Sequence, residues 1–274
     1  MASAALSVIC LTKREGLPPR AAWPGIAGAG VLWFGLYMVA LNWGERDVDA
    51  GTAAMLVNIG PVLVALLGGW LLHEGFPTRL LAGVGVSFAG AVVVGLSESH
   101  GGHAPVAGVV LCLVSACAYS VAVTCQKPAL RHASALQVTT FSCLVGTVTC
   151  LPFAGQFASQ LVHAPAAATL NVVYLGLFPT TVAFTTWAYA LARTTAGRMG
   201  ATTYLVPAIV VVMSWMLLGQ LPSWLTVIGG AACLAGVAVT RRSPREAPDY
   251  PRTAGTGASA VTAATPRTSQ TAGS

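Results

Sequence analysis

Charged residues are the scarcest class in this sequence. Of 274 residues, 8% are charged and 55% are hydrophobic, whereas a soluble globular chain carries about a quarter charged residues. With 14 Lys and Arg and 8 Asp and Glu, the chain has too little charge to cover a water-facing surface. The composition therefore excludes a soluble globular protein and indicates an all-α, polytopic integral membrane protein.

Nucleic-acid binding is not indicated either, although the formal net charge is +6. The basic residues occur singly between apolar runs and form no patch with interleaved aromatic residues. The orientation of a membrane protein explains their placement better. The lipid bilayer is the partner that the composition favours.

Motifs for disulfides, metals and catalysis are missing as well. The chain has 7 cysteines, an odd number, and no CxxC or Cys/His ligand spacing. It has no HExxH, no nucleophile elbow and no phosphate-binding glycine loop. A metal at His100 and His103 is an alternative that we rank well below a solvated loop. We therefore expect no catalytic residues, no metal and no cofactor.

Long apolar stretches are what the sequence does have. Eight are long enough to cross a hydrocarbon core, which takes about 20 residues. They run approximately over Ala22–Trp43, Ala50–Leu72, Leu80–Ser97, Ala104–Gln126, Leu136–Phe157, Leu170–Ala192, Met199–Gly219 and Ser223–Thr240.

Shorter segments surround these eight predicted spans. Residues 1–11 are apolar but would rise only about 16 Å as a helix, so they resemble the second half of a span. An outer loop is expected between Pro152 and Pro165, where proline, glycine and polar residues gather. Residues 243–274, rich in Ala, Thr, Ser, Pro and Gly, predict a disordered tail.

The orientation follows from counting basic residues on alternate sides of successive spans. One side receives 13 of the 14 Lys and Arg residues, including the tail and the Lys127 to Arg131 loop, and the other receives Arg46 alone. Because cytoplasmic loops carry an excess of Lys and Arg, the tail is predicted to be cytoplasmic. The predicted location is the cell membrane.

An internal repeat appears when the sequence is shifted by 146 residues. Residues 50–94 then align with 196–240 without a gap, at 10 identities in 45 positions, with Pro61 on Pro207 and glycines in register. The preceding helices end in the equivalent pairs Ala40-Leu41 and Ala190-Leu191, a shift of 150. An odd number of helices separates the copies, so the repeat is inverted, as in many secondary transporters.

These features resemble the drug/metabolite transporter superfamily, in its ten-helix branch of two EamA-like repeats. The resemblance is carried by AGTAAMLVNIGPVLVALLGGWLLHE, ending in Glu74, by AGRMGATTYLVPAIVVVMSWMLLGQ, ending in Gln220, and by ACAYS around Tyr119. It implies repeats at 1–97 and 104–242. The first repeat then has no counterpart of the family's first helix and the start of the second. Gln220 stands where the family usually has glutamate.

Candidate substrate-contacting residues follow from helix faces and from the repeat. Trp33 with Tyr37, Thr181 with Thr185, and Phe184 with Trp187 are three or four residues apart and share faces. The resemblance adds Tyr119, an aromatic of the family's sixth helix. The alternative is that these aromatics serve packing or anchor the chain at the membrane interface.

Two prolines predict breaks inside membrane spans. Pro61 and Pro207 each lack a backbone donor and disrupt the bond to the carbonyl four residues earlier. Asn58 and Tyr204, equivalent under the repeat, each lie three residues before their proline. Irregular backbone at membrane depth survives only against protein or a water-filled cavity. We expect both residues on a solute cavity, the alternative being a kink whose polar side chain bonds a neighbouring helix.

The apolar spans carry no Asp, Glu, Lys or Arg away from their ends. A cavity of aromatics, hydroxyls and amides suits a neutral, zwitterionic or amphipathic solute. The resemblance implies alternating-access transport of a small metabolite or drug-like molecule, with export favoured and a homodimer left open. The alternatives are a truncated membrane protein that does not transport and, further behind, a membrane-embedded enzyme.

Overall fold

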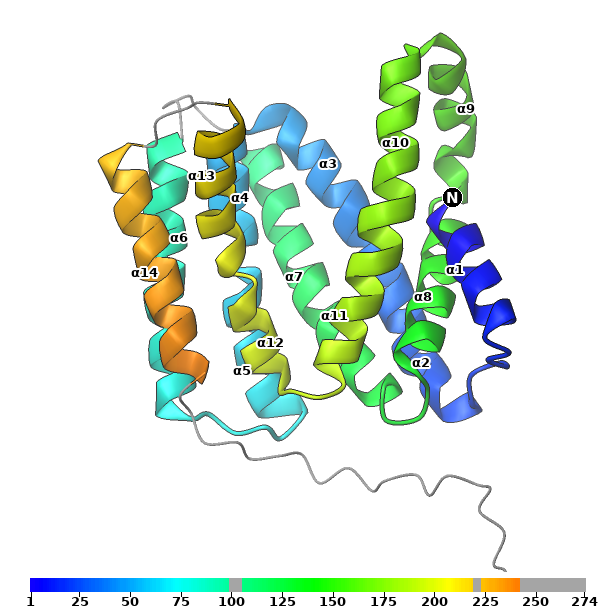
Figure 1. Cartoon of the computed structure of the whole chain (residues 1–274), viewed down its shortest axis with the longest axis horizontal. Helices are drawn as coiled ribbons and strands as arrows, with labels where there is room; N and C mark the ends of the chain where they lie inside the picture. Colours follow the sequence, from blue (N-terminus) through cyan, green and yellow to red (C-terminus); the bar gives the residue numbers. More distant parts are fainter. Residues whose placement is uncertain (99–104, 219–222, 242–274) are drawn as a thin grey trace, which may run out of the picture.

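The fold is a bundle of helices, seen in a computed structural model that describes residues 1–98, 105–218 and 223–241 (Figure 1). No strand occurs within these ranges, and the all-α, polytopic prediction is confirmed. The predicted tail, Gln220 and the His100/His103 loop lie outside the described residues.

The elements before residue 99 include one short helix and three long spans. They are α1 (Ala2–Thr12), η1 (Arg20–Ala22), α2 (Trp23–Ala29), η2 (Gly30–Tyr37), α3 (Met38–Asp47), α4 (Ala50–Val57), α5 (Gly60–Leu71) and α6 (Thr78–Glu98).

The elements after residue 104 form the second half. They are α7 (Val106–Ala129), α8 (Ala135–Thr149), η3 (Leu151–Phe153), α9 (Ala154–His163), α10 (Ala166–Phe178), η4 (Pro179–Ala183), α11 (Phe184–Leu191), α12 (Ala196–Thr202), α13 (Leu205–Leu218) and α14 (Trp224–Arg241).

Six stretches of the described chain are long and apolar enough to cross a membrane. A seventh is the pair Ala135–Thr149 and Leu151–His163, which bends by 50°. The remaining predicted span, Met199–Gly219, corresponds to α12 and α13, and its last residue lies outside the described ranges. Figure 1 places the α5–α6, α7–α8 and α11–α12 connections at one end and the α3–α4 and α9–α10 connections at the other.

One predicted loop is mostly helix. The segment from Pro152 to His163 is helical as η3 and α9, so only residues 164 and 165 separate α9 from α10. Pro152 sits in the first turn of η3, where the missing N–H of proline has no helical partner to lose. Pro152 therefore lies at a bend after Thr149, and the chain continues as helix beyond it.

The short helix α1 packs against α8. Leu6 and Cys10 of α1 form one buried cluster with Leu136 and Cys143 of α8. The hydroxyls of Ser3 and Thr147 lie 2.6 Å apart across the same contact. These contacts tie the beginning of the described chain to the second half of the molecule.

Helices α6 and α14 cross in opposite directions through a glycine contact. A Cβ on Gly90 would lie 2.6 Å from the Gly229 carbonyl oxygen, and one on Gly83 would lie 2.6 Å from that of Gly236. Gly83 is the repeat equivalent of Gly229, and Gly90 that of Gly236. The two contacts therefore exchange under the repeat, as expected of a two-fold relationship between the halves.

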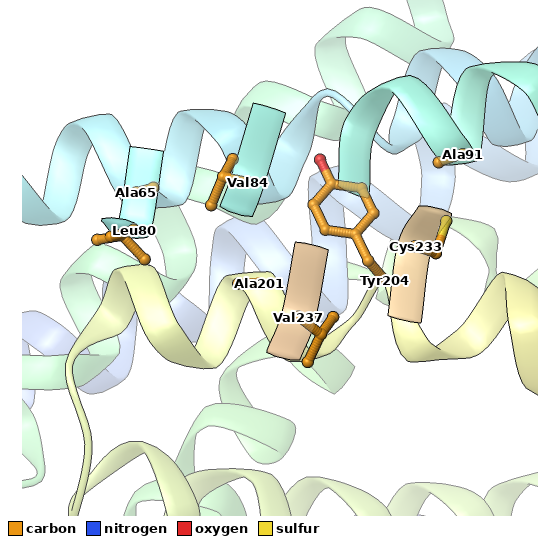
Figure 2. Packing of buried hydrophobic residues seen from close by; sticks show 8 residues of the cluster. All are labelled: Ala65, Leu80, Val84, Ala91, Ala201, Tyr204, Cys233 and Val237. Carbon is orange, nitrogen blue, oxygen red and sulfur yellow. The ribbon is translucent and has the colours of Figure 1, made fainter. Parts of the chain in front are cut away.

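The same symmetry runs through the core beside this crossing. Ser87 donates its hydroxyl to the Cys233 carbonyl over 3.1 Å, and the Cys233 thiol donates to the Ser87 carbonyl over 3.4 Å. These two residues are 146 apart, which is the repeat shift. Figure 2 shows the Tyr204 ring packed among the neighbouring buried residues Val84, Cys233 and Val237.

The spans that contain Pro61 and Pro207 are both interrupted, just before the proline. The first half breaks between α4 and α5 at residues 58–59, and the second between α12 and α13 at 203–204. The buried Tyr204 hydroxyl donates to the Asn58 carbonyl over 2.7 Å. Each break is thus in contact with its own repeat equivalent.

Equivalent residues also begin the interrupted spans. The Asp49 carboxylate caps α4 and accepts from the Thr52 backbone N–H over 3.0 Å and from its hydroxyl over 2.7 Å. These hydrogen bonds, led by the one from the Thr52 side chain, hold the pKa of Asp49 below its ordinary value. Thr195, its equivalent, caps α12 by accepting from the Arg198 N–H over 3.3 Å.

Candidate functional site

Two turns of π-helix lie at corresponding places in the two halves. η2 lies within the span Arg20–Asp47, and η4 within Ala166–Leu191. Under the 150-residue shift, Phe34 corresponds to Phe184 and Tyr37 to Trp187. A π-turn inserts an extra residue into a helix and is frequent at functional sites. The two turns therefore mark a candidate functional site.

Six aromatic side chains from η2, α7 and α11 meet beside these turns, and we call them the aromatic cluster. Trp33 is at its centre, with edge-on ring contacts to Tyr119 at 5.3 Å, Phe184 at 5.1 Å and Trp187 at 5.5 Å between centroids. The members are Trp33, Phe34, Tyr37, Tyr119, Phe184 and Trp187.

The aromatic cluster lies on the two-fold axis of the repeat. Phe34 and Phe184, which are equivalent, contact each other with centroids 4.8 Å apart. They join the pairs Asn58/Tyr204 and Ser87/Cys233, in which equivalent residues also meet. A site here is built from both halves at once.

The aromatic cluster also adjoins the α4–α5 break. A Cβ on Gly60 would lie 2.7 Å from the Tyr119 ring, so this glycine lets the ring approach the backbone. The neighbouring Ser120 hydroxyl donates to the Gly60 carbonyl over 2.9 Å. Tyr119 thus connects the aromatic rings with the irregular backbone.

Polar atoms in and beside the aromatic cluster are buried without a hydrogen-bond partner among the described residues. They are the Tyr119 hydroxyl, Trp187 Nε1 and the hydroxyl of Thr181, one turn before Phe184. Burying a polar group without a partner costs about 1–3 kcal/mol. A solute that accepts hydrogen bonds would relieve this cost, so the arrangement is suited to binding one.

The predicted site residues separate into groups. Trp33, Tyr37, Tyr119, Phe184 and Trp187 come together in the aromatic cluster. Tyr204 instead packs in the α6–α14 core and bonds the Asn58 backbone, which matches the alternative of a kink bonded to a neighbouring helix. For all of these residues, contact with a solute stays a prediction.

Of the two predicted threonines, Thr181 lies in η4 and Thr185 in α11, next to Phe184. The Thr185 hydroxyl donates to the Thr181 carbonyl within the helix, and Thr181 is buried. Phe34 was not predicted as a site residue. The 150-residue shift was the signal that could have found it, because that shift superimposes Phe34 on Phe184.

Two charged residues were expected at or near loops and make specific contacts. Lys127 lies inside α7, 1% exposed, and its ammonium donates to the carbonyls of Leu191, over 2.6 Å, and Thr194. The Glu74 carboxylate accepts from the Ala196 N–H over 2.7 Å. Both act on the connection between α11 and α12, just past the aromatic cluster.

Comparison with known proteins agrees with this geometry. The sequence model of the EamA-like transporter family matches residues 1–96 and 106–242. The chain therefore belongs to the EamA-like transporter family, and it is a multi-pass membrane transporter and not an enzyme. The resemblance inferred from the sequence is confirmed.

Individual relatives carry transporter names. The chain is 36% identical over 242 residues to a "Probable terminal-alkyne amino-acid exporter" of Streptantibioticus cattleyicolor, with 88% of this chain and 81% of that protein covered. It is 21% identical to a "Probable amino-acid metabolite efflux pump" of Salmonella typhimurium, over 74% of this chain and 70% of the relative. A protein of known crystal structure shares the fold with a TM-score of 0.73, at 22% identity and with 88% and 85% of the two chains covered.

Proposed function

We propose that this transporter exports a zwitterionic amino acid or amino-acid derivative from the cell by alternating access, and that the aromatic cluster is its substrate site. The observation that carries the proposal is the aromatic cluster on the repeat axis, with buried donors that lack acceptors. The names of the two exporter relatives support the substrate class and the direction.

The chemistry of the aromatic cluster suits both ends of a zwitterion. An ammonium group is attracted to the faces of Trp and Tyr rings, which Trp33, Tyr37 and Trp187 supply. A carboxylate accepts hydrogen bonds, which Trp187 Nε1 and the Tyr119 hydroxyl are free to donate among the described residues. Since the spans hold no carboxylate or ammonium away from their ends, an ion without its counter-charge is disfavoured.

The proposed orientation has the tail and the α11–α12 connection in the cytoplasm of a cell-membrane protein. It is supported by the 13 basic residues on that side. The connections assigned to this side lie at one end of the molecule in Figure 1.

Transport into proteoliposomes tests the function. A panel of radiolabelled neutral amino acids is compared with the matching amines and carboxylic acids. We expect zwitterions to enter faster than either single-ion analogue and faster than into empty liposomes. Equal rates with and without protein for the whole panel would favour the alternative of a membrane protein that does not transport.

A substitution pair tests the site. Trp187→Ala should lower the apparent affinity for the transported zwitterion about 5- to 150-fold, because a stacking or hydrogen-bonding group is worth about 1–3 kcal/mol. Trp224→Ala is the control, since Trp224 is 70% exposed at the start of α14. If both variants transport as the parent does, the aromatic cluster is not the substrate site.

A further inference from the structure

A second buried layer lies between the aromatic cluster and the α11–α12 connection. We call it the plug: Val64, Val123, Leu191 and Ala196, each 0% exposed and packed in one core with Trp33 and Tyr119. Val123 is one helical turn beyond Tyr119, and Leu191 one turn beyond Trp187. The plug therefore closes one side of the aromatic cluster.

Lys127 holds the α11 side of the plug. It is one turn beyond Val123 on α7, and its ammonium donates to the carbonyls of Leu191 and Thr194. These carbonyls lie at and just past the end of α11, where a cation is favoured because helix carbonyls there lack partners. Lys127 thus ties α7 to the end of α11, beneath the Tyr119–Trp187 contact.

Glu74 holds the other side of the same connection. Both of its carboxylate oxygens accept from the Ala196 N–H, over 2.7 and 2.9 Å, and one also accepts from the Gly197 N–H over 3.4 Å. Ala196 is a member of the plug. Hydrogen bonds to an ionised acceptor are stronger than neutral ones, so Glu74 fixes the start of α12.

The backbone around Glu74 is shaped for this contact. His73 and Gly75, on either side of it, have φ values of 55° and 74°, in the region that L side chains adopt at a cost. A Cβ on Gly68 would lie 3.0 Å from the Glu74 carboxylate and 3.2 Å from the Ala196 Cβ. The loop is therefore wound to bring the carboxylate between α5 and α12.

We propose that Lys127 and Glu74 form a clasp that keeps the plug shut, so that these positioning residues close the substrate site toward the cytoplasm. The orientation rests on the proposed function. Opening this side needs α11 or α12 to leave α7 and the α5–α6 loop, and both movements break charge-assisted hydrogen bonds. The clasp holds backbone groups at both ends of the four-residue connection 192–195, so α11 and α12 are restrained together.

Cysteine accessibility tests the clasp without any solute. Thr203 lies in the α12–α13 break, seven residues along the chain from the plug residue Ala196, so it is on the far side of the plug from the clasp. Thr203→Cys is labelled with a membrane-impermeant maleimide in inverted vesicles, where the cytoplasmic face is outward. The chain without the added cysteine gives the background labelling of its native thiols.

Lys127→Met should speed labelling of the cysteine at 203 by about fivefold or more, the change expected when a restraint worth roughly one hydrogen bond to a charged group is lost. Lys13→Met is the matched control, because Lys13 is exposed at the end of α1. Lys127→Arg, which keeps the donors, should restore slow labelling. Equal labelling rates in the Lys127→Met and Lys13→Met backgrounds would overturn the proposal.

Glu74→Gln provides an independent variant that keeps the side-chain shape. Amide hydrogen exchange at Ala196 and Gly197 should rise about fivefold or more, since the charged acceptor of both N–H groups is lost, with Asp47→Asn as the exposed carboxylate control. Unchanged exchange together with unchanged labelling at 203 would show that Glu74 is only a packing residue. Because neither readout involves transport, the clasp can fail while the proposed function stands, and the reverse also holds.

Discussion

Two buried tyrosines illustrate how different the same side chain can be in this protein. The Tyr204 hydroxyl donates to the Asn58 carbonyl, whereas the Tyr119 hydroxyl has no hydrogen-bond acceptor among the described residues. The sequence alone placed both near a solute. In the structure, Tyr204 completes an interrupted backbone, and Tyr119 is the one with a free group.

This difference predicts opposite outcomes for the two Tyr→Phe substitutions. Tyr204→Phe should lower the free energy of unfolding by about 1 kcal/mol or more, because it leaves the Asn58 carbonyl without its donor. Tyr119→Phe removes a hydroxyl that makes no hydrogen bond to the described residues, so stability should hold while transport of the zwitterion falls. Thermal melting in detergent and uptake into proteoliposomes measure the two effects. Equal melting temperatures for the two variants would contradict the prediction that Tyr204→Phe is the less stable one.

At the scale of helices, the α6–α14 crossing depends on glycine backbones in contact. Gly90→Ala should destabilise the protein by about 1–3 kcal/mol, because the new methyl group would meet the Gly229 carbonyl at 2.6 Å. Gly85→Ala is the control on the same helix, since nothing lies within 4 Å of its added Cβ. That change should be neutral or stabilising by up to about 1 kcal/mol. If Gly90→Ala and Gly85→Ala change the melting temperature by the same amount, the crossing tolerates a side chain at position 90.

The helices and their breaks could be predicted from sequence because their causes are local. Span length follows from apolar runs, and the breaks follow from Pro61 and Pro207. The π-turn at Phe34 and the helical path through Pro152 could not be predicted, since the packing of neighbouring helices decides where an extra residue or a bend is accommodated. Lys127 was counted with a loop because a lysine at a span end is normally solvated. Here the carbonyls of Leu191 and Thr194 take the place of water.

At the scale of the whole molecule, the predicted orientation assigns each exposed connection to one side of the membrane. His132→Cys, between α7 and α8, should react with an impermeant maleimide only in inverted vesicles. His163→Cys, at the end of α9, should react in intact cells. Both residues are exposed, so access and not burial decides the result. The reverse pattern would invert the protein and place the clasp on the outer face.

The contacts between equivalent residues set a rule for how substitutions act. If the two halves exchange conformations during transport, the surroundings of Phe34 in one state become those of Phe184 in the other. A symmetric change made at both members of such a pair alters the two end states by similar free energies, so it leaves their populations nearly equal to the parent's and changes the rate of passage between them. Lys127 and Glu74 lie off the axis at one end, so changes there act on one state more than the other and shift the balance. The pairs on the axis thus govern the rate of passage between the two states, and Lys127 and Glu74 govern the relative populations of those states.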